Sequence, residues 1–587
     1  MTSINLPDTV TTIGDAAFQF TGLTNVIIPS SVTNIGSGSF SRCQQLANVT
    51  ISNGLINIGD DAFQSCYGLT SINLPDTVTT IGDYAFQSTG LTNVIIPSSV
   101  TDIGSQSFSY CMQLANVTIS NGLINIGDDA FQYCYRLTSI NLPNSVTSIG
   151  GGAFEYCLAL TNIIIPSSTT NIGGWPFYYC MRLTAISVDT NNPAYSSLDG
   201  ILFDRSQTEL IEYPCGKSGG YTVPASVINI DDDAFANCSG LPAVAIGGNV
   251  VNIAPSAFIG CNFFTAITVD TNNLVYSSLG GVLFDKNQTA LLLCPAGMAG
   301  GYLIPNNISA IGDLAFFSCD NLTNVLIPNN VSSIGVEAFG YCTNLTNILI
   351  PIHVTSIGEA AFESCARLAS ITLPNSISNL GSFAFESCSS LNSITLPSGI
   401  SSIESFTFAG CSSLTNVSIP NNVTNIGDVA FAYCTNLTSI TIPASLSAIG
   451  NGTFSGCTRL TNMYFLGNAP DVSYGPFDWN SQTIAYYLPG TTGWSDFAIN
   501  AGIATALWFL PNPLILNGTT SFSVQSHNFG FTISWATNVS VTVEACTNIS
   551  NPVWQAVQTN VLTSGTAYFS DPQWTNYPSR FYRLRSP

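Results

Sequence analysis

The sequence predicts a repeat solenoid with a parallel β-sheet on one face and short helices or turns on the other, followed by a small all-β sandwich. Three observations support this fold class. A phenylalanine recurs every 22 or 23 residues, a cysteine usually follows it after three residues, and this period stops near residue 513. Repeats this short cannot bury a core singly, so they must stack. The recurring phenylalanines are Phe18, Phe40, Phe63, Phe86, Phe108, Phe131, Phe154, Phe177, Phe235 and Phe258, and the series resumes from Phe316 to Phe477.

Residues 69–91 show what one repeat contains. Apolar and polar residues alternate from Leu69 and stop at Pro75, which is typical of a short strand and its end. Gly82 permits a turn, and the apolar spacing from Gly82 to Leu91 then becomes helical. Each repeat therefore predicts a strand, a turn and a short helix. We expect the core to include Phe86, Phe131, Phe154, Phe339, Phe362, Phe385, Cys342, Cys365 and Cys388.

The first two blocks of three repeats are copies. Residues 1–68 and 69–136 differ at nine positions. The changes include Ala16/Tyr84, Asn34/Asp102, Arg42/Tyr110 and Ser65/Tyr133. Most of them fall where the pattern predicts solvent-facing side chains, which supports the inward and outward assignment.

The repeat resembles a known family. The motif I-x-x-I-G-x-x-A-F-x-x-C-x-x-L-x-x-I-x-I-P is similar to the BspA-type leucine-rich repeat. It is visible as Ile357-Gly358, Ala361-Phe362, Cys365, Leu368, Ile371 and Leu373-Pro374. The resemblance covers about residues 1–510 and implies a leucine-rich-repeat solenoid displayed on a cell surface that binds host or neighbouring-cell proteins.

We expect three parts in the chain: the solenoid at 1–465, a closing segment and linker at 466–511, and a β-sandwich at 512–587. The phenylalanine gap is 58 residues at 177–235 and again at 258–316. Each gap fits an additional hairpin, so we predict hairpin-bearing rungs at about 186–225 and 267–306. The stretch from Tyr486 to Trp494 resembles the closing segment of such arrays.

Composition narrows the class of partner. Only 7% of residues are charged, 45% are apolar and the formal net charge is −22. With 11 basic residues in 587, nucleic acid is not expected as a partner. No apolar run is long enough to span a membrane. The chain opens on a strand without a signal sequence or a polar capping repeat, from which we expect a further N-terminal piece upstream.

The cysteines predict buried thiols. Fifteen of the eighteen stand three residues after the repeat phenylalanine, on one inward line. Thr21 and Thr89 take the same place in two repeats, which favours a small buried side chain over a disulfide partner. No histidine accompanies this line and no C-x-x-C pair occurs, so no metal site or cofactor is expected.

The sequence does not indicate an enzyme. It holds two histidines, His353 and His527, and neither has a repeated serine or aspartate companion. Acidic pairs such as Asp60-Asp61 and Asp128-Asp129 recur before the phenylalanine. They could bind calcium, but a solvated acidic row is the preferred interpretation.

Two rows of side chains are expected to point out of the sheet, and neither carries a charge. The first is mainly Asn and Ser, and the second mixes Ile, Leu, Thr and Asn. The aromatic and arginine anchors of a tight protein interface are absent from these rows, so we expect weak, repeated contacts. The candidate partner contacts are Tyr195 and Tyr276 in the hairpin rungs and Asn324, Asn347 and Tyr464 on the strands.

These observations favour a non-catalytic, extracellular or cell-surface adhesion scaffold that binds proteins or surface polymers as a monomer. A carbohydrate- or polymer-binding accessory of a secreted system and a purely structural spacer stay open as alternatives. Beyond Pro513, alternating segments at 531–535, 539–543 and 581–585 predict the strands of the sandwich. We interpret the basic tip from Arg580 to Arg585 as its closing strand, in preference to an anchoring signal.

Overall fold

A computed structural model describes residues 2–472, 475–478, 482–508, 514–516, 522–525, 528–535, 540–563 and 565–585. It divides into two compact units. Unit 1 comprises Met1–Gly300 with Ile311–Asn321, and unit 2 comprises Gly301–Ala310 with Leu322–Pro587. Each unit is described by itself.

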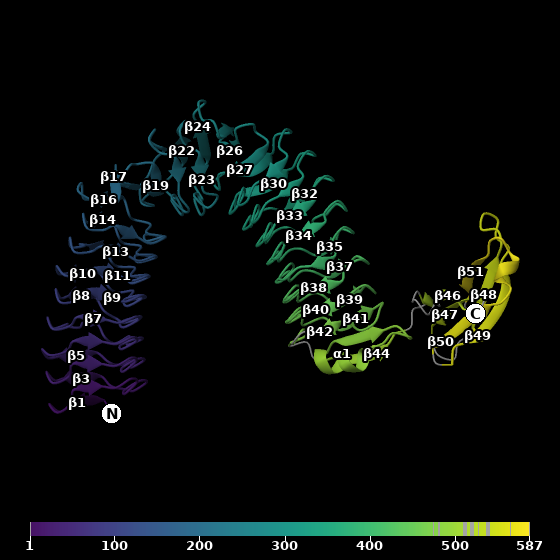
Figure 1. The fold of residues 1–587 in the computed structure, drawn as a ribbon, viewed down its shortest axis with the longest axis horizontal. Coiled ribbons are helices and arrows are strands. Elements are labelled where there is room, and N and C mark those ends of the chain that lie inside the picture. The colour runs from purple at the N-terminus through teal and green to yellow at the C-terminus, as the bar shows by residue number, and fades with distance from the viewer. Residues whose placement is uncertain are drawn as a thin grey trace. The chain divides into compact units, whose positions relative to one another are not determined.

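Unit 1 is a solenoid in which successive rungs pair their strands in parallel, except at the inserted hairpins (Figure 1). The strand predicted from Leu69 to Pro75 is wrong, because no strand forms there and the long strands are divided into two sheets at this rung. The longer strands are β1 (Ser3–Asn5), β3 (Asn25–Ile28), β5 (Asn48–Ile51), β8 (Asn93–Ile96), β10 (Asn116–Ile119), β12 (Ser139–Ile140), β14 (Asn162–Ile165) and β16 (Ala185–Val188). They pair in the order β1-β3-β5 and β16-β14-β12-β10-β8. Partners lie one repeat apart, as Val94 and Val117 do. Burial alternates along the four-residue strands β3, β5, β8, β10 and β14, so that the second and fourth residues face inward, as Val94 and Ile96 do in β8.

A second ladder of two-residue strands runs along the same rungs and was not predicted. Its members are β2 (Thr12–Ile13), β4 (Asn34–Ile35), β6 (Asn57–Ile58), β7 (Thr80–Ile81), β9 (Asp102–Ile103), β11 (Asn125–Ile126), β13 (Ser148–Ile149) and β15 (Asn171–Ile172). They form one parallel sheet in the order β15-β13-β11-β9-β7-β6-β4-β2. Each contributes one buried or half-buried isoleucine to the core, so this second ladder closes the side of the rung after the proline turn.

The segment around the repeat phenylalanine is a series of turns, so the short helix predicted for it is wrong. In the rung of Phe86, Tyr84 and Ser88 both have a φ of 58°. A left-handed residue on each side of Phe86 interrupts an α-helix. The amide of Phe86 donates to the carbonyl of Ser107 in the next rung at 2.8 Å, and Tyr84 and Ser88 do the same with Ser105 and Ser109. These bonds between rungs stabilise a backbone conformation that costs roughly 1–2 kcal/mol per residue in isolation.

The two long gaps hold antiparallel strands, as the sequence predicts. In the first, β17 (Tyr195–Leu198) pairs with β18 (Ile201–Asp204), which pairs with β19 (Glu209–Glu212). In the second, the equivalent strands are β25 (Tyr276–Leu279), β26 (Val282–Asp285) and β27 (Ala290–Leu293). Parallel pairing returns with β19 and β21 (Asn229–Ile230). Between the two sets of antiparallel strands lie β20 (Tyr221–Thr222), β22 (Ala243–Ile246), β23 (Asn252–Ile253) and β24 (Ala266–Val269).

Unit 2 contains further parallel rungs, with a helix between its last two solenoid strands. Its longer strands include β30 (Leu322–Leu326), β32 (Asn347–Leu349), β35 (Ser393–Thr395), β37 (Asn416–Ser418), β39 (Ser439–Ile442), β41 (Asn462–Phe465), β43 (Ile484–Tyr487) and β44 (Ala504–Leu507). Its short strands include β31 (Ser333–Ile334), β33 (Ser356–Ile357), β34 (Asn379–Leu380), β36 (Ser402–Ile403), β38 (Asn425–Ile426), β40 (Ala448–Ile449) and β42 (Asp471–Val472). Helix α1 (Trp494–Ala501) packs Trp494 and Phe497 against Phe465, with ring centroids 5.0 and 5.4 Å away.

The cores of both units are stacks of the repeat phenylalanines. Consecutive rings from Phe18 to Phe177 lie 5.2–5.8 Å apart and nearly parallel. In unit 2 the rings from Phe339 to Phe477 lie 5.2–5.6 Å apart. All nine predicted core residues are buried, namely Phe86, Phe131, Phe154, Phe339, Phe362, Phe385, Cys342, Cys365 and Cys388.

The C-terminal part of unit 2 is a small sandwich of antiparallel strands. One sheet contains β45 (Leu514–Leu516), β46 (Phe522–Gln525), β47 (Asn528–Ser534) and β50 (Thr566–Asp571). The other has the order β49 (Gln555–Val561), β48 (Ser540–Cys546), β51 (Phe581–Arg585). Phe531, Ile533 and Phe569 from the first sheet form one buried cluster with Val541 and Val543 from the second. The predicted segments around 531 and 581 are strands.

Candidate interaction surfaces

The outward face of the long strands in unit 1 presents aliphatic side chains at regular intervals. Ile27, Ile95 and Ile164 occupy the third position of β3, β8 and β14 and are 46%, 55% and 51% exposed. They stand 68 and 69 residues apart, which is three rungs. At about 4.8 Å per strand, the same apolar contact therefore returns roughly every 15 Å.

Uncharged polar side chains fill the space between these isoleucines. Asn48 Nδ2 donates to Asn25 Oδ1 at 2.6 Å across neighbouring rungs. Two shallow hollows overlap on β8, β10, β12 and β14. One of about 390 Å³ is lined by residues that include Asn93, Ile95 and Thr118, and one of about 280 Å³ by residues that include Thr118 and Ile164. The hollows thus connect two of the aliphatic positions along one surface.

The corresponding face of unit 2 brings two of the predicted contacts together. Asn324 of β30 and Asn347 of β32 are direct partners in the sheet, and Asn347 is exposed. Leu326 and Leu349 are partners two residues further on and are 51% and 65% exposed. Here the leucines, which were not among the predicted contacts, are the larger apolar groups in contact with water.

Tyr464 lies far from this pair in the sequence, near the end of the solenoid. Its ring is half-buried and lies 5.5 Å from the ring of Tyr486 on β43 and 4.7 Å from that of Trp508. It therefore belongs to an aromatic cluster of three rings on the closing strands.

The two hairpin tyrosines that the sequence offers as candidate partner contacts are largely covered by the preceding rung. The hydroxyl oxygen of Tyr195 accepts a hydrogen bond from the amide of Ile172 at 3.1 Å, and its ring is half-buried. Tyr276 is 8% exposed and accepts from the amide of Ile253 at 3.0 Å. Each phenol completes the edge of the preceding rung, because the inserted hairpin leaves an amide there without a strand partner.

A stack of tyrosines on the turns of unit 1 was missed. Tyr110, Tyr133, Tyr156 and Tyr179 have ring centroids 4.4, 4.6 and 4.5 Å apart along the series. All four have φ between 55° and 60° and stand two residues after a core phenylalanine. The signal was present as a tyrosine at the same repeat position in four successive rungs. Because the ring faces cover one another, mainly their edges and hydroxyl groups remain for solvent.

The acidic turns serve the backbone of the neighbouring rung. Asp60 Oδ1 accepts from the amide of Asp83 at 2.9 Å, and Asp128 Oδ1 accepts from that of Gly151 at 2.7 Å. Burial and the nearby carboxylates of Asp60 and Asp83 raise the pKa of Asp61. Within the described ranges, no group of three or more metal-binding side chains lies close enough together to hold an ion.

His353 and the cysteine thiols have backbone groups as hydrogen-bond partners in the described part of the chain. His353 is exposed, with Nδ1 3.0 Å from the carbonyl oxygen of Asn329. His527 lies outside the described residues. The thiols are buried and form no disulfides, and most of the sulfurs bond to the backbone, as Cys365 does with the Phe339 carbonyl at 3.2 Å. Burial raises the pKa of Cys111 to about 11, which keeps this thiol protonated at neutral pH.

One carboxyl is buried beside the first hairpin. Glu212, at the end of β19, is 9% exposed. Burial, followed by the proximity of Cys215, Asp233 and Asp231, raises the pKa of Glu212 well above its usual range.

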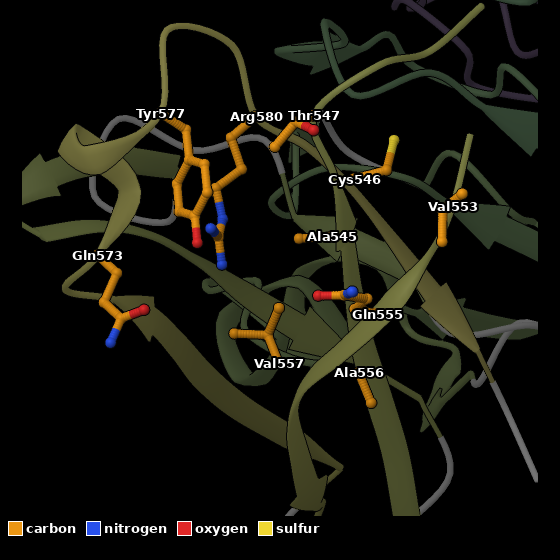
Figure 2. Close-up of a pocket in the computed structure, with 10 residues that line it drawn as sticks. All are labelled: Ala545, Cys546, Thr547, Val553, Gln555, Ala556, Val557, Gln573, Tyr577 and Arg580. Carbon is orange, nitrogen blue, oxygen red and sulfur yellow. The ribbon is translucent and has the colours of Figure 1, made fainter. Parts of the chain in front are cut away.

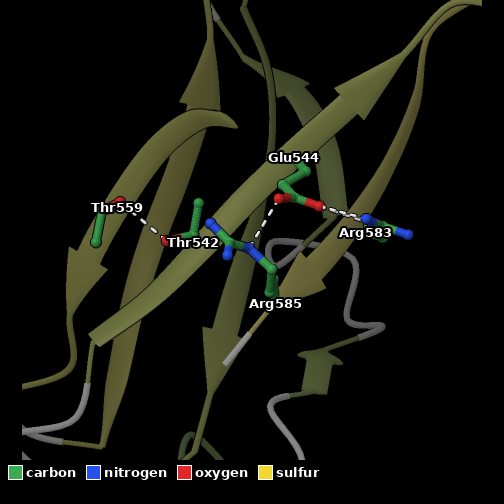
Figure 3. A network of polar contacts seen from close by, with 5 residues as sticks. All are labelled: Thr542, Glu544, Thr559, Arg583 and Arg585. Atoms are coloured by element: carbon green, nitrogen blue, oxygen red, sulfur yellow. Dashed lines mark hydrogen bonds and ion pairs between the residues drawn. The ribbon is translucent and has the colours of Figure 1, made fainter. Parts of the chain in front are cut away.

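The basic tip of the chain is paired within the sandwich (Figure 3). Arg583 and Arg585 on β51 flank Glu544 on β48, with N–O distances of 2.7 and 2.8 Å. The guanidinium of Arg583 also lies over the ring of Trp554, 4.5 Å from its centroid. These contacts agree with the interpretation of β51 as a closing strand. No helix in the described part of the chain has the length and apolar character needed to cross a bilayer.

Comparison with known proteins shows which solved structures the chain resembles. No curated protein matches the chain. Solved structures that resemble it include a leucine-rich repeat protein from Eubacterium ventriosum, with 24% identity over 59% of this chain and 83% of that one and a TM-score of 0.41. Another is a leucine rich cell surface protein from Faecalibacterium prausnitzii, with 26% identity over 71% and 87% and a TM-score of 0.37.

Family membership rests on the repeat itself. The model of the BspA type leucine rich repeat region, which contains six copies of the repeat, matches residues 1–115, 102–217, 212–288, 302–395 and 378–485. These matches extend over both units and contain the phenylalanine and cysteine positions that build the core. The chain belongs to the BspA-type leucine-rich repeat family.

Proposed function

We propose that this protein is a non-catalytic scaffold, extracellular or on a cell surface, that binds other proteins through weak contacts repeated along its sheet. The observation that carries the proposal is the return of an exposed isoleucine, Ile27, Ile95 and Ile164, at one strand position every third rung. One partly buried isoleucine contributes less than the roughly 1.5–3 kcal/mol of a fully buried aliphatic side chain. Useful affinity therefore requires several positions to be occupied at once.

The surrounding surface supports a protein partner of low charge. Of the 587 residues only 7% are charged, and the outward rows of the strands are Asn, Ser, Thr and aliphatic residues. Such a surface is easily desolvated, because asparagine and threonine exchange hydrogen bonds with water for bonds to a partner at little net cost. The surface display implied by the BspA-type repeat fits this composition, and a monomeric solenoid leaves the whole face available.

The test uses the full chain and two matched sets of variants. Ile27→Asn, Ile95→Asn and Ile164→Asn remove the sheet-face contacts singly and together. Ile56→Asn and Ile124→Asn are the control, because Ile56 and Ile124 are 48% and 40% exposed but lie before the short strands, off this face. The wild-type chain is first screened on an array of extracellular and cell-surface proteins, and its affinity for a hit is then measured.

We expect each single sheet-face change to weaken binding about 5-fold and the triple change about 100-fold, which corresponds to roughly 1 kcal/mol per contact. Binding that persists in the triple variant, or falls equally in the control pair, would contradict the proposal. Selective binding to a glycan array with no protein hit would favour the carbohydrate-binding alternative.

A further inference from the structure

The C-terminal sandwich contains a pocket of about 450 Å³ (Figure 2). Cys546 at the end of β48 and Gln555 and Val557 on β49 line one side of it. Gln573, Tyr577 and Arg580, from the segment between β50 and β51, line the other side. A volume of this size lies within the range of small-molecule sites, roughly 300–1,000 Å³.

Arg580 is held firmly at this pocket. Its side chain is 12% exposed, and its Nε lies 2.8 Å from Asp571 Oδ2. Its guanidinium also lies over the ring of Tyr577, 4.2 Å from the centroid. Asp571 is itself buried and accepts hydrogen bonds from the Tyr582 hydroxyl and from the backbone amide of Gln573, each at 2.9 Å. One carboxylate thus fixes the positions of both Arg580 and the turn that carries Gln573.

The guanidinium presents an edge to the open part of the pocket. In Figure 2 the terminal nitrogens of Arg580 and the hydroxyl of Tyr577 lie side by side and are directed between Gln573, Val557 and Gln555. A planar guanidinium with a fixed orientation pairs best with a planar carboxylate, which it can bind with two parallel hydrogen bonds. Because Asp571 already offsets the charge of Arg580, a ligand with a single negative charge fits better than a dianion such as a phosphate monoester.

The other side chains that line the pocket indicate which kind of ligand would carry this carboxylate. The carboxamides of Gln555 and Gln573 and the Tyr577 hydroxyl can each donate and accept hydrogen bonds, which suits a ligand with several hydroxyl groups. Ala545, Val553, Ala556 and Val557 also line the pocket, so the experiment below has to distinguish a sugar from the terminal residue of a peptide. The C-terminal part of the chain is less acidic than the rest: residues 512–587 hold three arginines and two carboxylates, a formal net charge of +1, whereas the whole chain carries −22.

We propose that this pocket binds the carboxylate of an acidic sugar, a hexuronic acid or a residue of that kind in an acidic glycan. Arg580 binds the carboxylate, and Gln555 and Gln573 bind ring hydroxyl groups. This role is separate from the protein contacts of the sheet face, so the Ile27, Ile95 and Ile164 variants leave it unchanged.

The test compares two sugars that differ only in the carboxylate. Binding of methyl β-D-glucuronide and methyl β-D-glucoside to the full chain is measured by saturation-transfer NMR and calorimetry. We expect the glucuronide to bind at least 10-fold more tightly, and this preference to shrink at high salt. Gln555→Ala and Gln573→Ala should each weaken glucuronide binding about 5-fold. Gln558→Ala is the matched control, because Gln558 lies on the same strand but does not line the pocket.

Arg580→Gln should abolish the preference for the charged sugar. If that variant unfolds because Asp571 loses its partner, the sugar pair and the two glutamine variants still decide the question. Equal affinity for the two sugars, no effect of the two glutamine changes, or an equal effect of Gln558→Ala would overturn the proposal. Binding of a peptide with a free C-terminal carboxylate, but not of the glucuronide, would assign the pocket to peptides and refute the sugar.

Discussion

Removing one ring from the phenylalanine stack tests whether the repeats form a continuous core. Phe362 is fully buried, and its ring lies 5.2 Å from that of Phe339 and 5.5 Å from that of Phe385, nearly parallel to both. Phe362→Ala leaves a cavity and should cost about 3–5 kcal/mol. The two lost ring contacts account for about 1–3 kcal/mol of this at 0.5–1.5 kcal/mol each. Because each rung contacts mainly its neighbours, the loss should be local.

Hydrogen exchange of backbone amides in the full chain measures this loss where it occurs. The amides of Phe339 and Phe362 donate to the carbonyls of Ala361 and Ala384 in the following rungs, at 2.8 and 2.9 Å. A loss of about 3 kcal/mol should speed their exchange more than 100-fold, while the amides around Phe86 in unit 1 stay protected. Phe263→Ala is the control, since Phe263 is 67% exposed and its removal should change stability by less than about 0.5 kcal/mol. Unchanged exchange at Phe339 and Phe362, or an equal effect of the control, would refute the stacked core.

Three further changes follow from particular side chains. Burial raises the pKa of Glu212 in the folded protein above its value of about 4 in the unfolded chain. The protonated carboxyl therefore contributes fully to stability below about pH 4, and this contribution is lost as the pH rises through the pKa of the folded state. Glu212→Gln should therefore raise the melting temperature at pH 7 but not at pH 4, and the control Asp76→Asn, at an exposed position, should raise it at neither pH. A lower melting temperature of Glu212→Gln at pH 7 would show instead that the carboxylate of Glu212 is ionised and paired. Gly54→Ala should destabilise the protein by more than about 1 kcal/mol in chemical denaturation, because the φ of Gly54 is 142° and the new methyl group would meet the Ser30 carbonyl. The control Gly22→Ala should be close to neutral, because the space around Gly22 is open. All eighteen cysteines are buried and none forms a disulfide, so an aromatic disulfide reagent should modify the thiols only when the chain unfolds. Rapid reaction of the native protein would contradict this packing.

The sequence was most informative where a repeat position must be buried. Phe362, Cys365 and their equivalents recur because each ring and each sulfur meets a copy of itself in the next rung, so few other side chains fit. This regularity made the solenoid, the core and the hairpin insertions predictable. The family could also be identified, because its motif consists of these same buried positions.

Other features could not be read from apolar spacing. The segment Gly82–Leu91 has helical spacing, yet Tyr84 and Ser88 are left-handed because their amides bond to the next rung. Such bonds between backbones leave little trace in side-chain chemistry. The burial of Tyr195 and Tyr276 could not be read for a related reason: the amides that their hydroxyls bind lie 23 residues earlier in the chain. Whether Asn324, Asn347 and Tyr464 meet a partner stays a prediction, since exposure alone does not identify a contact.

The bonds that join each turn to the next also govern how such a gene can change in length. An insertion of a few codons would place amides and carbonyls out of phase along the ladder, whereas a gain or loss of one entire coil leaves every donor opposite an acceptor. Unequal crossing-over between the near-identical segments 1–68 and 69–136, which differ at nine positions, would produce whole-coil changes of this kind. Descendants of this chain can therefore become longer or shorter by recombination while the fit between adjacent coils is preserved.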